Sequence, residues 1–237
     1  MQASETDLGY VARPDAETRA GVVVVHDVWG LSGHTRDFAR RFADEGFVAL
    51  AVNLYRRLGR VEITDAGAWM RALSDPDVLA EIAAAARALR EAHGSTRVGV
   101  VGFCMGGSYA LMAGCGAAAV DAVVPFYGIL SHRHGLLHAP EGLDPRKKPC
   151  EPVAAAVGLA CPILAFFGAE DVYIPLDDVE ALKRVLAKSA QPHELVVYPN
   201  AGHAFMNDTR PQAFRPDVAA DAWRRTLAFL RTHLRAT

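Results

Sequence analysis

The chain has 237 residues, of which 51% are hydrophobic and 22% charged, so it can bury a substantial core within one α/β domain. Its formal charge is only −2, which gives no electrostatic reason to expect nucleic acid or a membrane surface as a partner. Residues 1–10 contain no basic stretch followed by an apolar one, so we expect no signal peptide. The four cysteines lack CxxC spacing, and we expect them to be reduced thiols in a cytoplasmic protein.

The predicted elements alternate between strand and helix along the chain. Residues 20–26 include the continuous β-branched run GVVVV, which is typical of a strand buried on both faces. A helix over 35–45 should end at Gly46, and a helix over 76–92 should end at Gly94. The remaining strands are expected at 47–52, 97–102, 120–127, 163–167 and 194–198, and the remaining helices at 106–113, 178–188 and 217–234.

This alternation predicts a mostly parallel central sheet with helices on both faces, in a single domain that spans residues 1–237. An apolar tract from Tyr109 to Leu130 is long enough for a membrane span, but Asp121 and several glycines favour a buried helix followed by a buried strand. One segment, residues 131–158, is too long and polar for an ordinary connection. It is either a lid, an interface element or a tolerated surface insertion.

A glycine-rich turn gives the strongest chemical signal. Gly102-Phe-Cys104-Met-Gly106 lies between a buried strand and a helix, which is the pattern of a nucleophile elbow with cysteine in the place of serine. Small residues on either side let the backbone turn sharply, and the N-terminus of the following helix favours a thiolate. The alternative is a structural cysteine in a glycine-rich turn.

A thiol nucleophile needs a base and a group that orients the base. His203 follows the last predicted strand, and Asp171 follows the strand before it, so both lie at carboxyl ends of parallel strands, where sites form. Glu170 is the rival acid. The oxyanion hole would then use the backbone N–H groups of Met105 and Val28.

These pieces resemble the dienelactone hydrolase (carboxymethylenebutenolidase) family of the α/β-hydrolase superfamily. The matching segments are His26–Gly30 (HDVWG), Asn53–Tyr55, the GFCMGG elbow, Phe126–Gly128, the GAEDVYIP loop and Ala201–Phe205 (AGHAF). The resemblance implies an α/β-hydrolase fold and a Cys104–His203–Asp171 triad. It also implies hydrolysis of esters or enol-lactones through a thioester, without a cofactor.

The resemblance assigns further roles and exposes three departures from the family pattern, at Asp27, at Asn207 and in the long 131–158 segment. Asp27 stands where the family carries an acid, usually glutamate, that helps to activate the thiol, although Asp27 can also cap a turn. Arg57 fills the first of two family positions that bind a substrate carboxylate. The second position holds Asn207, and the next arginine is Arg210. Cations of the 131–158 segment could replace the missing clamp, and these are Arg133, Arg146, Lys147 and Lys148.

Aromatic side chains near the motifs, among them Trp29, Tyr55 and Tyr127, are candidates for the substrate pocket, although core packing explains most aromatic residues equally well. Two other functions stay open. The chain could be a non-catalytic α/β-hydrolase relative that binds a ligand or partner. A metal site could use cysteines and histidines of the polar segment, but their spacing fits no usual zinc pattern, and we expect none. The sequence does not give the oligomeric state.

Overall fold

One eight-stranded sheet organises the protein in the computed structural model, which describes residues 1–59, 61–116 and 119–234. The spatial order of the strands is β1-β2-β4-β3-β5-β6-β7-β8. Strands β3 to β8 pair in parallel, and β1 and β2 add an antiparallel edge. The strands are β1 (Gln2–Thr6), β2 (Gly9–Arg13), β3 (Ala20–Val25), β4 (Val48–Val52), β5 (Arg97–Phe103), β6 (Ala122–Phe126), β7 (Ile163–Gly168) and β8 (His193–Tyr198).

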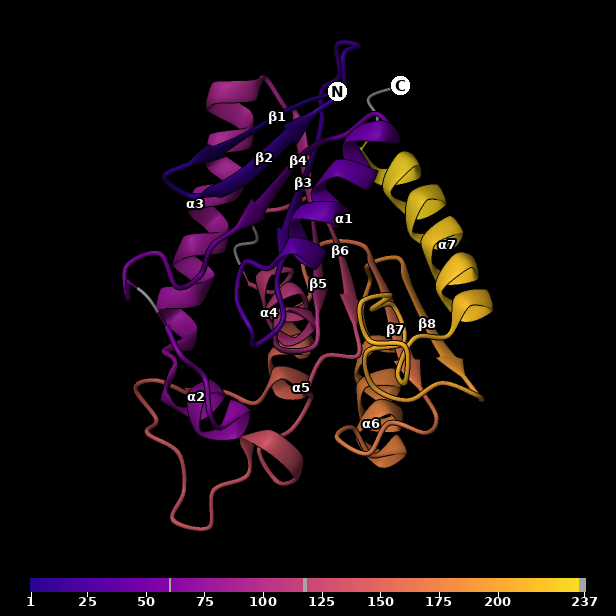
Figure 1. The fold of residues 1–237 in the computed structure, drawn as a ribbon. Helices are drawn as coiled ribbons and strands as arrows, with labels where there is room; N and C mark the ends of the chain where they lie inside the picture. Colours follow the sequence, from indigo (N-terminus) through magenta and orange to yellow (C-terminus); the bar gives the residue numbers. More distant parts are fainter. Residues whose placement is uncertain (60, 117–118, 235–237) are drawn as a thin grey trace.

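Helices cover both faces of the sheet. Helices α1 (Gly33–Asp44) and α7 (Pro216–Leu234, yellow in Figure 1) pack on one face. Helices α3 (Asp75–His93) and α4 (Met105–Ala113) pack on the other face, and α6 (Leu176–Leu186) continues this layer through α5 (Pro152–Ala155). Every residue of β3, β4 and β7 is buried, as their uninterrupted apolar runs predict for strands between two helical layers.

The observed elements agree closely with those predicted between residues 20 and 234. Gly94 adopts a left-handed conformation with φ 67° and ends α3, and Gly46 ends the first helix with φ 87°. Residues 117–118 of the apolar tract lie outside the described residues. Among the residues that the structure describes, no helix is long and apolar enough to cross a membrane.

The sequence prediction did not contain the β1–β2 hairpin, helix α2 (Ala66–Ala72) or the short helices of the 131–158 segment, which are η1 (Gly135–Leu137), α5 and η2 (Ala156–Gly158). The β1–β2 hairpin lies along β4, and all five residues of β1 are exposed, so its sequence carries no alternating apolar pattern. Helix α2 has only seven residues, and the Asp65 side chain caps its N-terminus by accepting a hydrogen bond from the Ala68 N–H. Its short length leaves little periodicity to detect.

The 131–158 segment packs firmly against the helical layer. Lys148 is 6% exposed, and its Nζ lies 2.5 Å from Asp75 at the start of α3 and 3.1 Å from the Tyr109 hydroxyl of α4. The Tyr109 hydroxyl also donates to Asp75. Burial lowers the pKa of Lys148, and Asp75 opposes this effect. Arg71 of α2 donates to the Leu136 carbonyl at the other end of the segment.

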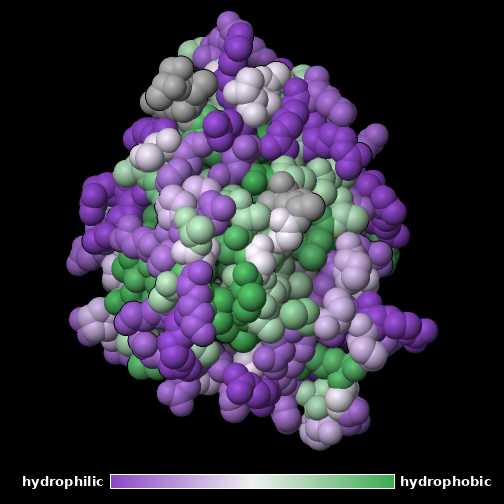
Figure 2. Space-filling model, turned by 180° about the vertical axis from the view of Figure 1, so that it is seen from behind, coloured by the Kyte–Doolittle hydropathy of each residue, from purple (hydrophilic) through white to green (hydrophobic). Residues whose placement is uncertain are grey.

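The surface opposite to the view of Figure 1 has an apolar area near its middle (Figure 2). A shallow cavity of about 360 Å³ lies between α3 and α4, and its lining is mainly alanine and larger apolar side chains such as Leu79, Met112 and Val120. Its lining includes none of Cys104, Asp171 and His203.

Replacing Lys148 by methionine should lower the free energy of unfolding by about 3–5 kcal/mol, because Asp75 would remain buried without its counter-ion. Urea unfolding followed by circular dichroism measures the change. Lys147→Met is the matched control, since Lys147 is exposed, and should change stability by less than about 0.5 kcal/mol. The double variant Lys148→Met/Asp75→Asn should recover part of the loss. Equal stability of Lys148→Met and the wild type would contradict this account.

Candidate active site

The turn between β5 and α4 requires glycine on both sides of Cys104. A Cβ on Gly102 would stand 1.9 Å from the Gly106 carbonyl oxygen, and a Cβ on Gly106 would stand 2.4 Å from the Val25 carbonyl oxygen. Cys104 itself has φ 55° and ψ −119°, which is an unusual conformation for a residue with a side chain. This is the geometry of a nucleophile elbow.

The backbone of Cys104 is hydrogen-bonded, whereas its sulfur does not cap the following helix. Its N–H donates to the Phe126 carbonyl of the neighbouring strand, and its carbonyl accepts from Gly107 N–H at 2.8 Å. The residue precedes the first residue of α4, so the positive end of the helix lies at the thiol. The side chain is nearly buried, with 8% exposure.

The loops after β7 and β8 bring the acid and the histidine together. His203 Nδ1 lies 2.8 Å from Asp171 Oδ2, and Asp171 Oδ1 accepts from the Tyr173 N–H at 2.9 Å. The Asp171 side chain is fully buried, whereas Glu170 is exposed. Of the two acids that the sequence offered, Asp171 is therefore the partner of His203.

His203 is coupled electrostatically to Cys104. Burial alone would lower the pKa of His203, but the charge of Cys104 and the hydrogen bond with Asp171 outweigh it and raise the pKa to about 10. The other ring nitrogen, Nε2, is buried and makes no hydrogen bond of ordinary geometry within the described residues. Tyr127 and Tyr173 contact the imidazole edge-on, each with ring centroids 5.1 Å away, and fix its plane.

Two backbone N–H groups are available for an oxyanion. Neither Val28 N–H, in the loop after β3, nor Met105 N–H, at the start of α4, donates to an acceptor in the part of the chain that the structure describes. Gly106 packs directly against the carbonyls of Val25 and His26, which brings the loop and the helix start together. These are the two positions expected from the sequence.

Asp27 is partly buried, and its Oδ1 accepts from the Trp29 N–H at 2.9 Å. This is the turn-capping arrangement that the sequence left open. Its charge also reaches the site, because it is among the causes that raise the pKa of Tyr127. A direct role at the thiol stays a prediction.

The family model described as "Dienelactone hydrolase family" matches residues 8–234. The chain belongs to the dienelactone hydrolase family. The α/β-hydrolase fold and the resemblance found in the sequence are thereby confirmed, together with the broad activity of a hydrolase that acts on esters or lactones.

The family members in the comparisons match this chain along most of its length. A Yersinia pestis protein named "Putative carboxymethylenebutenolidase" is 31% identical over 232 residues, which are 94% of this chain and 83% of that protein. A Bradyrhizobium protein named "Probable 2-oxo-3-(5-oxofuran-2-ylidene)propanoate lactonase" is 32% identical over 236 residues, which are 97% of this chain and 91% of that protein. A crystal structure described as "Putative Dienelactone Hydrolase from Klebsiella pneumoniae" has a TM-score of 0.82 and 33% identity, and covers 94% of this chain and 92% of its own.

In this member of the dienelactone hydrolase family, the first of the two arginine positions holds Arg57. Arg57 is exposed, and its Nε pairs with Glu81 Oε1 at 2.8 Å. Glu81 also pairs with Arg56, whose Nε lies 2.7 Å from Glu81 Oε2. The arginine that the sequence predicted to bind substrate therefore forms an ion pair with Glu81 of α3 in the structure.

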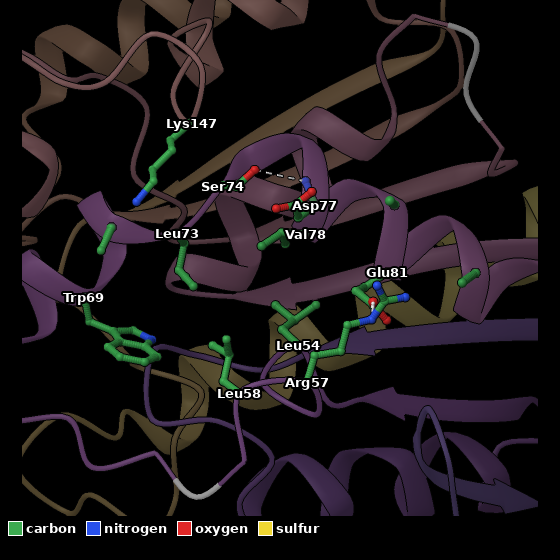
Figure 3. A pocket seen from close by; sticks show the side chains of 13 residues that line it. Leu54, Arg57, Leu58, Trp69, Leu73, Ser74, Asp77, Val78, Glu81 and Lys147 are labelled. Carbon is green, nitrogen blue, oxygen red and sulfur yellow. Dashed lines mark hydrogen bonds and ion pairs between the residues drawn. The ribbon is translucent and has the colours of Figure 1, made fainter.

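Arg57 lines a cavity whose wall includes none of Cys104, Asp171 and His203. This cavity has a volume of about 560 Å³ and lies between the loop after β4, α2 and α3. Figure 3 shows Arg57 beside Glu81 at one end and Lys147 at the other, with Trp69 and Leu58 along the wall. Trp69 packs edge-on against Tyr55, whose hydroxyl contacts Val28 O and Met105 Sδ. Tyr55 thus lies directly against the loop that carries Val28.

Arg210 lies beside Trp29 in the structure, although the sequence offers no reason to select it. Asn207 is buried and its Oδ1 accepts from the Thr209 N–H, which forms a tight turn. The turn returns the chain so that the Arg210 guanidinium lies 5.6 Å from the centre of the Trp29 ring. Arg210 also lowers the pKa of the buried Tyr127, against the larger raising effect of burial.

The cations of the 131–158 segment have other partners or places. Arg133 pairs with Asp178, Arg146 with Asp144 and Lys148 with Asp75, while Lys147 lines the remote cavity. Among the described residues, no three His, Cys, Asp or Glu side chains gather as metal ligands. A role of these cations in binding a substrate carboxylate stays a prediction.

Removing the Cys104 sulfur should lower the titration midpoint of His203 below about 10, because the thiolate charge helps to hold the imidazolium. The measurement is an NMR titration of the His203 ring in Cys104→Ala and in the wild type. Cys161→Ala is the control, since Cys161 is buried elsewhere against the Gly114 carbonyl. An unchanged His203 midpoint in Cys104→Ala would show that Cys104 does not affect the pKa of His203.

Proposed function

We propose that this member of the dienelactone hydrolase family hydrolyses activated esters and enol-lactones with Cys104 as nucleophile. The observation that carries the proposal is the His203–Asp171 hydrogen bond of 2.8 Å, on an imidazole whose pKa is raised by Cys104. A raised pKa keeps the ring protonated at neutral pH, and an imidazolium beside the sulfur favours a thiolate.

The acylation step uses these groups in order. The Cys104 thiolate attacks the acyl carbon, a C–S bond forms, and the carbonyl electrons move to oxygen. The N–H groups of Val28 and Met105 stabilise this oxyanion. When it collapses, the C–O bond breaks and His203 gives its proton to the departing alkoxide or enolate. A thioester on Cys104 remains.

In deacylation His203 accepts a proton, whereas in acylation it donates one. His203, now neutral and oriented by Asp171, takes a proton from water, which attacks the thioester carbonyl. The second tetrahedral adduct expels the Cys104 thiolate, and the acid is released. A tetrahedral adduct of a thiolate tends to lose sulfur unless the other leaving group is good, which favours enol-lactones and activated esters over amides.

The relatives support this choice of substrate, since one of those compared is named a lactonase of an oxofuranylidene acid. The four cysteines are free in the structure, which supports the cytoplasmic location expected from the sequence. A non-catalytic binding protein is the second candidate. It would have no use for a strained cysteine between two obligatory glycines, beside a paired histidine.

Replacing Cys104 by alanine should lower kcat for p-nitrophenyl acetate at least about 10³-fold, because the covalent step is lost. Mass spectrometry of the quenched wild-type reaction should find the acyl group on Cys104. Cys150→Ala is the matched control and should keep wild-type kcat. Wild-type activity in Cys104→Ala would remove the thiol mechanism, and an inert protein with an unreactive Cys104 would favour the binding candidate.

We further propose that Arg210, beside Trp29 at the site, binds the carboxylate of an anionic substrate. Arg210→Gln should raise KM for an anionic ester about tenfold, because a charge-assisted hydrogen bond is lost. KM for a neutral ester with the same leaving group should stay unchanged. Arg57→Gln is the comparison variant. A KM increase in Arg57→Gln, and none in Arg210→Gln, would favour the arginine that the sequence selected.

A further inference from the structure

His26, the first residue after β3, is completely buried and hydrogen-bonded on both ring nitrogens. The Leu54 N–H donates to Nε2 at 3.2 Å, so Nε2 carries no proton and the neutral ring has its proton on Nδ1. Burial lowers the pKa of His26, although the Asp27 carbonyl and the Asp27 charge oppose it. The ring is therefore a neutral, fixed donor at physiological pH.

The Nδ1–H of His26 donates to the carbonyl oxygen of Asp27, 2.5 Å away. That carbonyl belongs to the same peptide group as the Val28 N–H. The peptide is planar and trans, so its C=O and its N–H point in opposite directions. Fixing the Asp27 oxygen therefore fixes the direction of the Val28 N–H.

Further hydrogen bonds in this loop fix the same peptide group and the one that follows it. The Gly30 N–H also donates to the Asp27 carbonyl, at 3.2 Å. The next peptide is held at both ends, because the Tyr55 hydroxyl donates to Val28 O and the Trp29 N–H donates to Asp27 Oδ1. The Val28 N–H is the group of these two peptides left without an acceptor among the described residues.

We infer that His26 is a positioning residue whose Nδ1–H holds the Asp27–Val28 peptide so that the Val28 N–H points at the developing oxyanion. The inference rests on the proposed function, which gives this N–H its task. The Leu54 hydrogen bond prevents the ring from turning over, because a flipped ring would lose both partners. The orientation is thus set before substrate binds, as stabilisation of a transition state requires.

Two substitutions separate the hydrogen bonds of the ring. In His26→Asn the amide nitrogen can occupy the place of Nδ1 and still donate to Asp27 O, while the Leu54 contact is lost. In His26→Gln the longer amide reaches the Leu54 N–H, while nothing remains at the place of Nδ1. His93→Gln, at the end of α3, is the control for a histidine outside the site.

Three measurements test the inference on p-nitrophenyl acetate. His26→Gln should lower kcat about 10²-fold with KM changed less than about threefold, as for the loss of one oxyanion donor. His26→Asn should recover kcat to within about tenfold of wild type. Alkylation of Cys104 by iodoacetamide forms no oxyanion, so its rate should be the same in both variants and in the wild type.

The outcomes are distinct. Wild-type kcat in folded His26→Gln would overturn the inference, as would equal losses in the Asn and Gln variants. Parallel loss of alkylation and hydrolysis would show a general structural role instead. If His26→Gln does not fold, His26→Asn decides alone, because a 10²-fold loss there with normal alkylation contradicts the Nδ1 role. The proposed function fails separately, if alkylated wild-type protein remains active.

Discussion

The approach of Gly106 to the end of β3 is the constraint on which the site depends. A single methyl group at Gly106 would collide with the carbonyls of Val25 and His26, so no other residue lets α4 begin so close to the sheet. This contact places the first turn of α4 against the loop that follows β3. The sulfur, the helix N-terminus and both candidate oxyanion donors are brought together by one backbone packing requirement.

The parallel sheet supplies the remaining parts. Strands β7 and β8 are neighbours and run in the same direction as β5, so the loops after them emerge at the same edge as the elbow. The carboxylate of Asp171 is held by the Tyr173 N–H, and the ring of the same tyrosine contacts His203. The acid loop therefore fixes both the charge and the plane of the base.

Much of this arrangement could be predicted from the sequence, because buried parallel strands are continuous apolar runs and the elbow needs glycines at fixed positions. The hairpin of β1 and β2 could not, since β1 is exposed along its whole length and β2 has only five residues, too few to show a clear period. The partner of Arg57 could not either, because Glu81 lies on another element and ion pairs have no sequence signature. The place of Arg210 beside Trp29 could not be predicted either, because it depends on the turn at Asn207.

The buried contact of Lys148 with Asp75 and Tyr109 has an evolutionary consequence. It joins the 131–158 segment to the start of α3 and to α4, the helix that follows Cys104, in a place where an unpaired buried charge is costly. Relatives that shorten or replace the 131–158 segment should therefore lose the lysine at position 148 and the carboxylate at position 75 together. The two positions are expected to co-vary, even though 72 residues of intervening chain separate Asp75 from Lys148.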